Sequence, residues 1–187
     1  MMEVDLLLPQ LRFIQATERE TLYSGAFGAG KTRAVCLKLM SRVAGRPAAR
    51  EGLCRKHLVS LKATTLRTLL EPDGNLPPVL PAGTYTHNKS EKVIRVNGGG
   101  SIYYFGVGDS EDYTKLGSLN LSGCAIDEAV ELSEQDWTML RGRIRLAIDD
   151  LPIQLYGACN PGPPSHFLAV RFGLAGGHKP APNTAAY

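Results

Sequence analysis

The chain has 187 residues, of which 43% are hydrophobic and 21% charged, and its formal net charge at pH 7 is +3. This length suits one domain with a sizeable core and leaves little room for a second, and the composition excludes disordered and fibrous proteins. No apolar run approaches the length of about 18 residues that a membrane span needs, and the chain begins with acids instead of the basic start of a signal peptide, so we expect a cytoplasmic protein without a membrane partner.

Short strand patterns alternate with helical patterns along the chain, which predicts an α/β domain with a largely parallel sheet. Helices are indicated where apolar residues recur at three- and four-residue spacing, and strands where short apolar runs lie between turn residues. In chain order, the predicted elements are a strand at 21–24, a helix at 31–43, a strand at 52–54, a helix at 57–70, a hairpin of 92–96 with 101–105, a strand at 121–126, a helix at 133–146 and a strand at 153–158. From residue 173 onward no periodicity is visible, and we expect an irregular tail.

The segment between the first strand and the first helix matches the P-loop, or Walker A, pattern G-x-x-x-x-G-K-[ST] in full. Its glycines let backbone N–H groups and a helix N-terminus cradle a β-phosphate. Lys31 is expected to neutralise β- and γ-phosphate oxygens, and Thr32 to place its hydroxyl on Mg²⁺. The sequence therefore predicts an ATP site. The segment consists of Gly25, Ala26, Phe27, Gly28, Ala29, Gly30, Lys31 and Thr32.

Two adjacent carboxylates, Asp127 and Glu128, follow the apolar strand predicted at 121–126. Asp127 is expected to hold the water shell of Mg²⁺, and Glu128 to orient and polarise an attacking water. Kinases on the same fold must exclude water and generally lack the second acid, so the pair favours ATP hydrolysis over phosphoryl transfer. The alternative is that both acids only cap the helix that follows.

At this point the sequence resembles a family, the large subunit of tailed-phage terminases, in its N-terminal ATPase domain. That family carries a P-loop near its N-terminus, an acidic pair after an apolar strand, and a small-x-Asn-Pro motif after the next strand. Here the second and third motifs are residues 125–129 and 158–161, and the order, spacing and intervening residues agree from about residue 8 to residue 172. The resemblance implies a P-loop NTPase of the ASCE or RecA-like type. This is a three-layer sandwich with a mostly parallel central sheet and a β-hairpin insertion, with residues 1–172 as the ATPase domain.

The resemblance also implies two further site residues. Gln10, upstream of the P-loop, is expected to read adenine with both faces of its amide, although it is also compatible with an exposed N-terminal glutamine. Asn160 is expected to sense the γ-phosphate and to pass its loss to the rest of the domain, although an Asn-Pro turn is the simpler alternative.

In one respect the loop departs from the family pattern. Many terminases carry an arginine inside the P-loop, and the corresponding dipeptide at 26–27 is Ala-Phe. Charge on the γ-phosphate in the transition state must then be met elsewhere. Lys115, before the strand that leads to the acidic pair, and Arg143 on the following helix are candidates for that catalytic role. Arg141 and Arg145 are alternatives on the same helix, and each of these cations is also compatible with a solvated surface.

Partners follow from the resemblance too. They are double-stranded DNA, the terminase small subunit, the portal protein, and further copies of the chain, which form a ring on the portal and associate weakly in isolation. The mild net charge permits a DNA partner without indicating one. A basic cluster of Arg55, Lys56, Lys62 and Arg67 either faces DNA or is a solvated helix face.

Full terminases also carry a C-terminal nuclease domain, which nothing after residue 172 could form. We therefore expect residues 173–187 to begin a truncated linker, and the chain to hydrolyse ATP without cutting DNA. A virus-encoded or prophage-encoded protein would act in the host cytoplasm.

Three other functions stay open from the sequence. The first is a helicase-like or repair-type ATPase, which shares the P-loop and the acidic pair but needs a second RecA-like domain. The second is a small-molecule or nucleotide kinase, which predicts an arginine-rich lid and no catalytic glutamate. The third is a nucleotide-binding switch without turnover.

Overall fold

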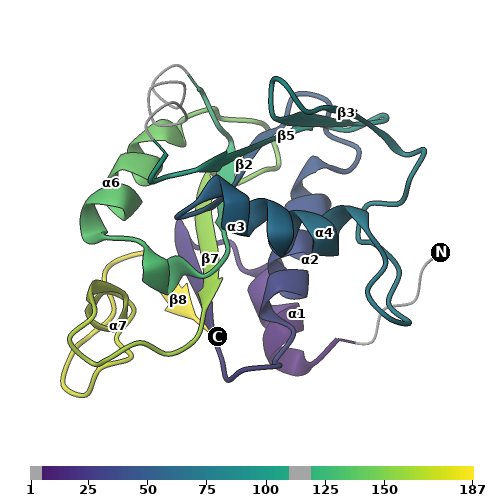
Figure 1. Ribbon diagram of the computed structural model, residues 1–187. Helices are drawn as coiled ribbons and strands as arrows, with labels where there is room; N and C mark the ends of the chain where they lie inside the picture. The colour runs from purple at the N-terminus through teal and green to yellow at the C-terminus, as the bar shows by residue number, and fades with distance from the viewer. Residues whose placement is uncertain (1–5, 110–118) are drawn as a thin grey trace.

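One sheet runs through the centre of the computed structural model, which describes residues 6–109 and 119–187 (Figure 1). Its described strands are β1 (Glu20–Ser24), β2 (Arg50–Arg55), β3 (Tyr85–Asn88), β4 (Val93–Val96), β5 (Ser101–Gly106), β6 (Gly123–Ile126), β7 (Gln154–Cys159) and β8 (Thr184–Ala186). They lie in the order β3-β4-β5-β2-β6-β7-β1-β8. Neighbours from β5 to β8 pair in parallel, whereas β4 pairs antiparallel with both β3 and β5. The predicted α/β class, mostly parallel sheet and β-hairpin are confirmed.

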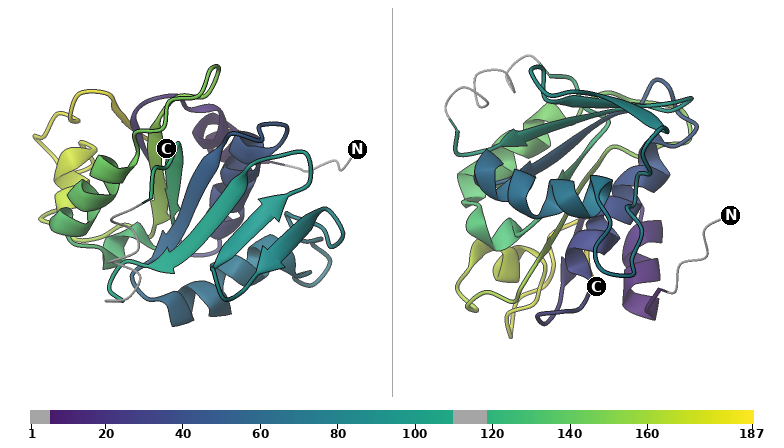
Figure 2. Two further views of the ribbon diagram at one scale, coloured as in Figure 1. Left: turned by 90° about the horizontal axis from the view of Figure 1, so that it is seen from above. Right: turned by 45° about the vertical axis from the view of Figure 1, so that its right-hand side comes forward.

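Helices cover both faces of the sheet and complete a three-layer sandwich (Figure 2). On one face lie α1 (Leu8–Gln15), α2 (Lys31–Val43), α3 (Leu58–Ala63) and α4 (Thr65–Leu70). On the other lie the short helix η1 (Ala129–Glu131), α6 (Glu134–Arg143) and α7 (Phe167–Arg171). None of the helices in the described part of the chain is long and apolar enough to cross a membrane.

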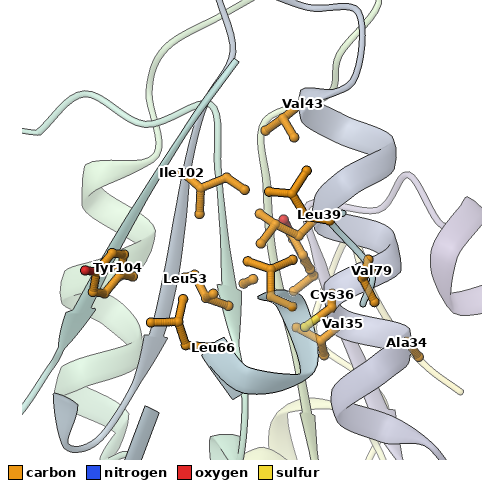
Figure 3. Close-up of a cluster of buried hydrophobic side chains, with 14 of the residues drawn as sticks. Ala34, Val35, Cys36, Leu39, Val43, Leu53, Leu66, Val79, Ile102 and Tyr104 are labelled. Carbon is orange, nitrogen blue, oxygen red and sulfur yellow. The ribbon is translucent and has the colours of Figure 1, made fainter. Parts of the chain in front are cut away.

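Successive residues of the central strands point into two different cores. Leu53 of β2 and Ala125 of β6 lie in the core beneath α2, whereas Cys54 and Ile126 lie in the core beneath α6. Figure 3 shows the first core, where Leu53 lies near Leu66 of α4. Because both faces of β6 are buried, its sequence is a continuous apolar run instead of an alternating one. This is why β6 can be recognised from the sequence.

Two of the predicted helices differ from the observed ones, while the helix at 31–43 is confirmed as α2 to the residue. The helix expected at 57–70 is broken at Thr64, which has φ −124° and ψ −77°. The Thr64 hydroxyl donates to the Ser60 carbonyl at 2.9 Å, a local bond that competes with helical hydrogen bonding. The helix expected at 133–146 ends at Arg143, because Ile144 forms an isolated parallel bridge with Leu121.

The expectation of an irregular tail is wrong for its last residues. β8 pairs in parallel with β1, and the Tyr187 amide donates to the Leu22 carbonyl at 2.9 Å. Without β8, this side of β1 would be a sheet edge with unpaired backbone groups. A three-residue strand is too short to show a periodic pattern, and α1 and β3 were likewise not predicted.

A buried ion pair fixes α2 to the sheet. Arg42 Nε donates to Glu51 Oε2 at 3.0 Å, and the two side chains are 5% and 0% exposed. Glu51 also accepts hydrogen bonds from the hydroxyls of Ser122 at 2.8 Å and Tyr156 at 3.0 Å. Arg42 in turn donates to Gln154 Oε1 at 3.2 Å. Since these partners come from β2, β7 and the start of β6, the network holds α2 in a fixed position across three strands.

Replacing Arg42 with methionine should therefore destabilise the protein severely. The variant leaves Glu51 buried without a countercharge, which costs about 3–5 kcal/mol in comparable pairs. As a control, Arg46→Met removes the exposed pair with Asp150 and should cost about 0–1 kcal/mol. Urea unfolding measures both free energies, and equal losses in the two variants would show that the buried pair does not anchor α2.

Candidate nucleotide site

The glycine-rich loop at 25–30 connects β1 to α2 through a backbone that favours glycine. Gly28 has φ +79° and Gly30 has φ +67°, both in the left-handed region. A Cβ at Gly30 would also lie 2.6 Å from the Gln10 amide nitrogen. Gly30 caps α2, so the positive end of that helix adjoins the loop. This is the arrangement that binds phosphate groups elsewhere.

The Lys31 side chain lies inside the loop. Lys31 is 9% exposed, and its ammonium donates to the Ala26 carbonyl at 2.7 Å. The bond holds the charge at the centre of the loop, where phosphate oxygens of a nucleotide would be stabilised. Phe27, by contrast, points into solvent and is 96% exposed.

The buried carboxylate of Asp127 accepts hydrogen bonds from two threonines. Thr32 Oγ1 lies 3.2 and 3.1 Å from its two oxygens, and Thr65 Oγ1 donates to Oδ2 at 2.6 Å. Burial raises the pKa of Asp127, and the hydrogen bonds from Thr65 and Thr32 oppose that shift. A hydroxyl and a carboxylate in contact form the oxygen ligand set that Mg²⁺ prefers, so these residues fit the ion.

Glu128 adopts a backbone conformation that is rare for a residue with a side chain. Its φ is 50° and its ψ is 51°, a left-handed geometry that costs of order 1–3 kcal/mol. Burial, followed by the charge of Asp127, raises the pKa of Glu128. Strain and a raised pKa at one carboxylate are typical of functional sites. The turn separates the two acids, so that Asp127 contacts the threonines while Glu128 lines a cavity.

That cavity has a volume of about 430 Å³ and lies at the edge of the sheet where the parallel strands end. The P-loop follows β1, the acidic pair follows β6, and Asn160 follows β7. Because these three strands are neighbours in the order β6-β7-β1, their carboxyl ends bring the three motifs together. Ligands of open parallel sheets bind at this edge. The residues that line the cavity are Phe27, Gly28, Gly30, Lys31, Thr32, Arg33, Thr68, Asp73, Leu76, Glu128 and Asn160.

Asn160 contributes an unsatisfied polar atom to the cavity wall. Its Oδ1 is buried and has no hydrogen-bond partner in the described residues. A buried acceptor without a donor costs about 1–3 kcal/mol. A water or ligand that donates to this oxygen would therefore be stabilised here.

Gln10 lies beside the P-loop and not among the residues that line the cavity. Its Nε2 donates to the Ala29 carbonyl at 3.1 Å, and its Oε1 accepts from the Leu7 amide at 2.9 Å. Both faces of the amide are thus engaged with backbone. The adenine contact expected for Gln10 stays a prediction, and it requires the amide to give up these two hydrogen bonds for bonds to the base.

Of the two candidates for a catalytic cation, Arg143 is not among the residues that line the cavity. Lys115 falls at 110–118, outside the described residues. Arg143 lies in the last turn of α6, where its carbonyl accepts from the Leu121 amide at 3.1 Å. That contact is at the edge where β6 begins, whereas the cavity lies where the strands end. Arg141 lies on the same helix and pairs with Glu20 at 3.1 Å.

Two residues of the site were not predicted from the sequence: a cation that lines the cavity, and a threonine that donates a hydrogen bond to Asp127. Arg33 lines the cavity, and its guanidinium donates to the Pro77 carbonyl at 3.0 Å. Its position directly after the P-loop pattern could have singled it out. Thr65 carries no such signal, because only the tertiary fold brings α4 to the end of β6.

A family model described as phage terminase large subunit matches residues 17–174 of this chain. No curated protein sequence matches this chain. Among solved structures, the large terminase from a thermophilic bacteriophage superposes with a TM-score of 0.71 at 17% identity, covering 98% of this chain and 45% of that one. The same protein in complex with ATP-gamma-S gives a TM-score of 0.70 at 18% identity, with 98% and 44% covered. This chain thus spans less than half of that large terminase.

The large terminase ATPase domain of Thermus phage P74-26 is also similar, with a TM-score of 0.67 at 13% identity. The match covers 98% of this chain and 80% of that domain. At these identities the structural matches establish the fold. They agree with the three-layer sandwich.

Burial of Asp127 makes a testable prediction about stability and pH. The pKa of Asp127 is higher in the folded protein than in the unfolded chain. Asp127 therefore stabilises the folded state below the unfolded pKa of about 3.9, and this stabilisation is lost as pH rises through the folded pKa. Asp127→Asn should therefore raise the melting temperature of the nucleotide-free protein at pH 7, by about 2–4 °C per kcal/mol relieved. The gain should shrink towards pH 4.

Calorimetry across pH measures this difference. Asp149→Asn, an exposed site, serves as the control and should leave the melting temperature unchanged. A lower melting temperature for Asp127→Asn at pH 7 would mean that the two threonine hydrogen bonds outweigh the cost of the buried charge.

Proposed function

This chain belongs to the phage terminase large subunit family, and from that premise we propose that it is the ATP-hydrolysing motor domain of a DNA-packaging terminase. In this role, ATP hydrolysis drives double-stranded DNA into the procapsid. The observation that carries the proposal is the convergence of the P-loop, Glu128 and Asn160 on one cavity. The large terminase of the thermophilic bacteriophage has been solved in complex with ADP and with ATP-gamma-S, which supports a nucleotide in the same place here.

The proposed roles follow from the positions of the side chains. Lys31, at the centre of the loop, binds β- and γ-phosphate oxygens. Thr32 and Asp127 would hold Mg²⁺, partly through water, which would supply positive charge beside the phosphates. Glu128 orients and polarises the attacking water, and its raised pKa brings it closer to the range of an effective general base. Asn160 hydrogen-bonds the water or the γ-phosphate and reports its loss.

The charge that develops on the γ-phosphate needs a cation as well. Among the described residues, Arg33 contributes the guanidinium that lines the cavity. Lys115 and Arg143 remain proposals for the same role. Because Arg143 lies at the opposite edge of the sheet, it would have to act on the cavity of a neighbouring subunit.

The proposed partners follow from family membership. They are double-stranded DNA, the small subunit and the portal protein, with copies of the chain forming a ring on the portal and associating weakly in its absence. We assign ATP hydrolysis to this domain, whose sheet is completed by β8, and place the motor in the host cytoplasm.

Glu128→Gln tests the catalytic assignment. The variant keeps the shape of the side chain but cannot accept a proton from water, so kcat should fall by about 100-fold or more while ATP affinity changes little. Glu134→Gln, an exposed acid in the first turn of α6, is the matched control. Steady-state turnover with Mg²⁺ measures both, and a Glu128→Gln enzyme as fast as wild type would overturn the assignment.

Gln10→Ala tests the adenine contact. If Gln10 reads the base, its loss should weaken ATP binding by roughly tenfold, the value of one or two hydrogen bonds, and should reduce the preference for ATP over GTP. Binding of tripolyphosphate, which has no base, should not change.

Gln15→Ala, at the exposed end of the same helix, serves as the control. Titration calorimetry gives the affinities. An equal loss for ATP and tripolyphosphate would show that Gln10 acts only by supporting the P-loop through Ala29.

A further inference from the structure

A second cavity, of about 550 Å³, lies on the other side of α4 from the nucleotide site. It is bounded by α3 and α4 and by the strands β3 and β5. Lys62 and Arg67 from the helices, and Tyr85, His87 and Lys89 from β3 and the residue after it, are among its lining residues. We call it the α4 groove.

Cations approach the α4 groove from both of its walls. Lys62 lies on the helical wall and Lys89 at the end of β3, and both are exposed. No ion-pair partner of either lysine occurs in the described residues. Burial lowers the pKa of His87, and the charges of Lys89 and Lys62 lower it further. Two lysines on facing walls, neither of them paired within the described part of the chain, suit an extended anion.

The inner wall of the groove is aromatic. Tyr104 is buried, and its hydroxyl lies 2.9 Å from His87 Nε2, with the two rings packed edge to face. Tyr85 lines the same wall. Aromatic rings beneath a rim of lysines suit a polymer with alternating charged and apolar parts.

Other basic residues of the expected cluster are already neutralised. Arg55 pairs with Glu131 at 2.6 Å, and Lys56 pairs with Asp136 at 2.8 Å. These pairs tie the end of β2 to η1 and α6. Arg67, which lines the groove, pairs at 2.9 Å with Glu71, an acid that lines it as well, so the charge available for an anion is that of the two lysines.

The helix α4 presents one face to each of the two cavities. Thr65 donates to Asp127, and Thr68 lines the nucleotide cavity. Leu66 and Leu70 line the α4 groove, and at 100° per residue they project from the opposite side of the helix. A movement of Asp127 that shifted α4 would therefore also shift the wall of the groove.

We propose that the α4 groove binds the phosphodiester backbone of DNA and that α4 couples this groove to the nucleotide cavity. The proposal rests on the packaging function proposed above. Lys62 and Lys89 contact phosphates from the two walls, while the tyrosine and histidine rings pack against sugars. The grip is independent of sequence, because phosphate contacts carry no base information.

Charge reversal of the two lysines tests the groove. The double variant Lys62→Glu with Lys89→Glu, in the full chain, is compared with Arg12→Glu with Lys179→Glu, which changes the net charge equally at exposed sites away from the groove. Fluorescence anisotropy with a short DNA duplex is measured over a range of salt concentrations. Losing two phosphate contacts should lower the salt slope of log K by about 1.8, at about 0.9 per contact, and weaken binding at least tenfold relative to the control.

The outcomes distinguish failure of the proposed DNA site from failure of the proposed packaging function. If both double variants bind DNA equally well and melt like wild type, DNA does not bind in the α4 groove, while the packaging function stands. If the wild-type chain hydrolyses ATP but binds no DNA at low salt, the groove and the packaging function both fail. If the groove variant loses binding to poly-glutamate as strongly as to DNA, the groove is a general acidic-polymer site and the proposal is overturned.

Thr65→Val tests the coupling, because it removes the hydroxyl that donates to Asp127 and preserves the shape of the side chain. In wild type, DNA affinity should differ between the ADP-bound and ATP-gamma-S-bound forms, and in Thr65→Val that difference should shrink at least threefold. Thr138→Val on the exposed face of α6 is the control. A nucleotide-dependent difference that persists unchanged in Thr65→Val would show that α4 does not transmit the signal.

Discussion

The buried carboxylate of Asp127 joins three segments that are far apart in the sequence. It ends β6, accepts from Thr32 at the start of α2, and accepts from Thr65 at the start of α4. The phosphate loop, the acidic pair and the helix beside the α4 groove are thereby held at one point. Burial opposes the charged form of the carboxylate, so the cluster is stabilised by its hydrogen bonds and is poised for a cation. The nucleotide site and the proposed DNA site both depend on this contact.

A second constraint fixes where the P-loop points. The helix that follows the loop is anchored at its far end by Arg42 and Glu51, which are buried and surrounded by Ser122, Tyr156 and Gln154. A buried pair of this kind contributes more to geometry than to net stability. With one end of α2 held by the ion pair and the other joined to Asp127, the loop cannot rotate independently of the sheet. Catalytic geometry requires such rigidity, because small displacements of reacting groups cost large factors in rate.

The two sides of the molecule serve different purposes. Along the carboxyl edge, strained and polar residues such as Glu128 and Asn160 face a cavity, which is where a parallel sheet places its ligands. On the side of β3 and β5, lysines that have no ion-pair partner among the described residues line a groove. The proposed motor function requires that the occupancy of one site change the properties of the other. The short helix α4, with a face toward each, is the element that can do so.

The sequence alone determined the fold class, the central strands and the P-loop, because each depends on a local pattern. The helix at 31–43 follows from apolar spacing, and the loop from glycines that permit left-handed backbone. Only the tertiary structure decided which residues, distant in the sequence, come into contact. Sequence spacing could not bring Thr65 to Asp127, leave Arg143 at the far edge of the sheet, or pair the last residues with β1. These contacts join residues tens of positions apart, and they depend on strand order and helix placement, which no local pattern encodes.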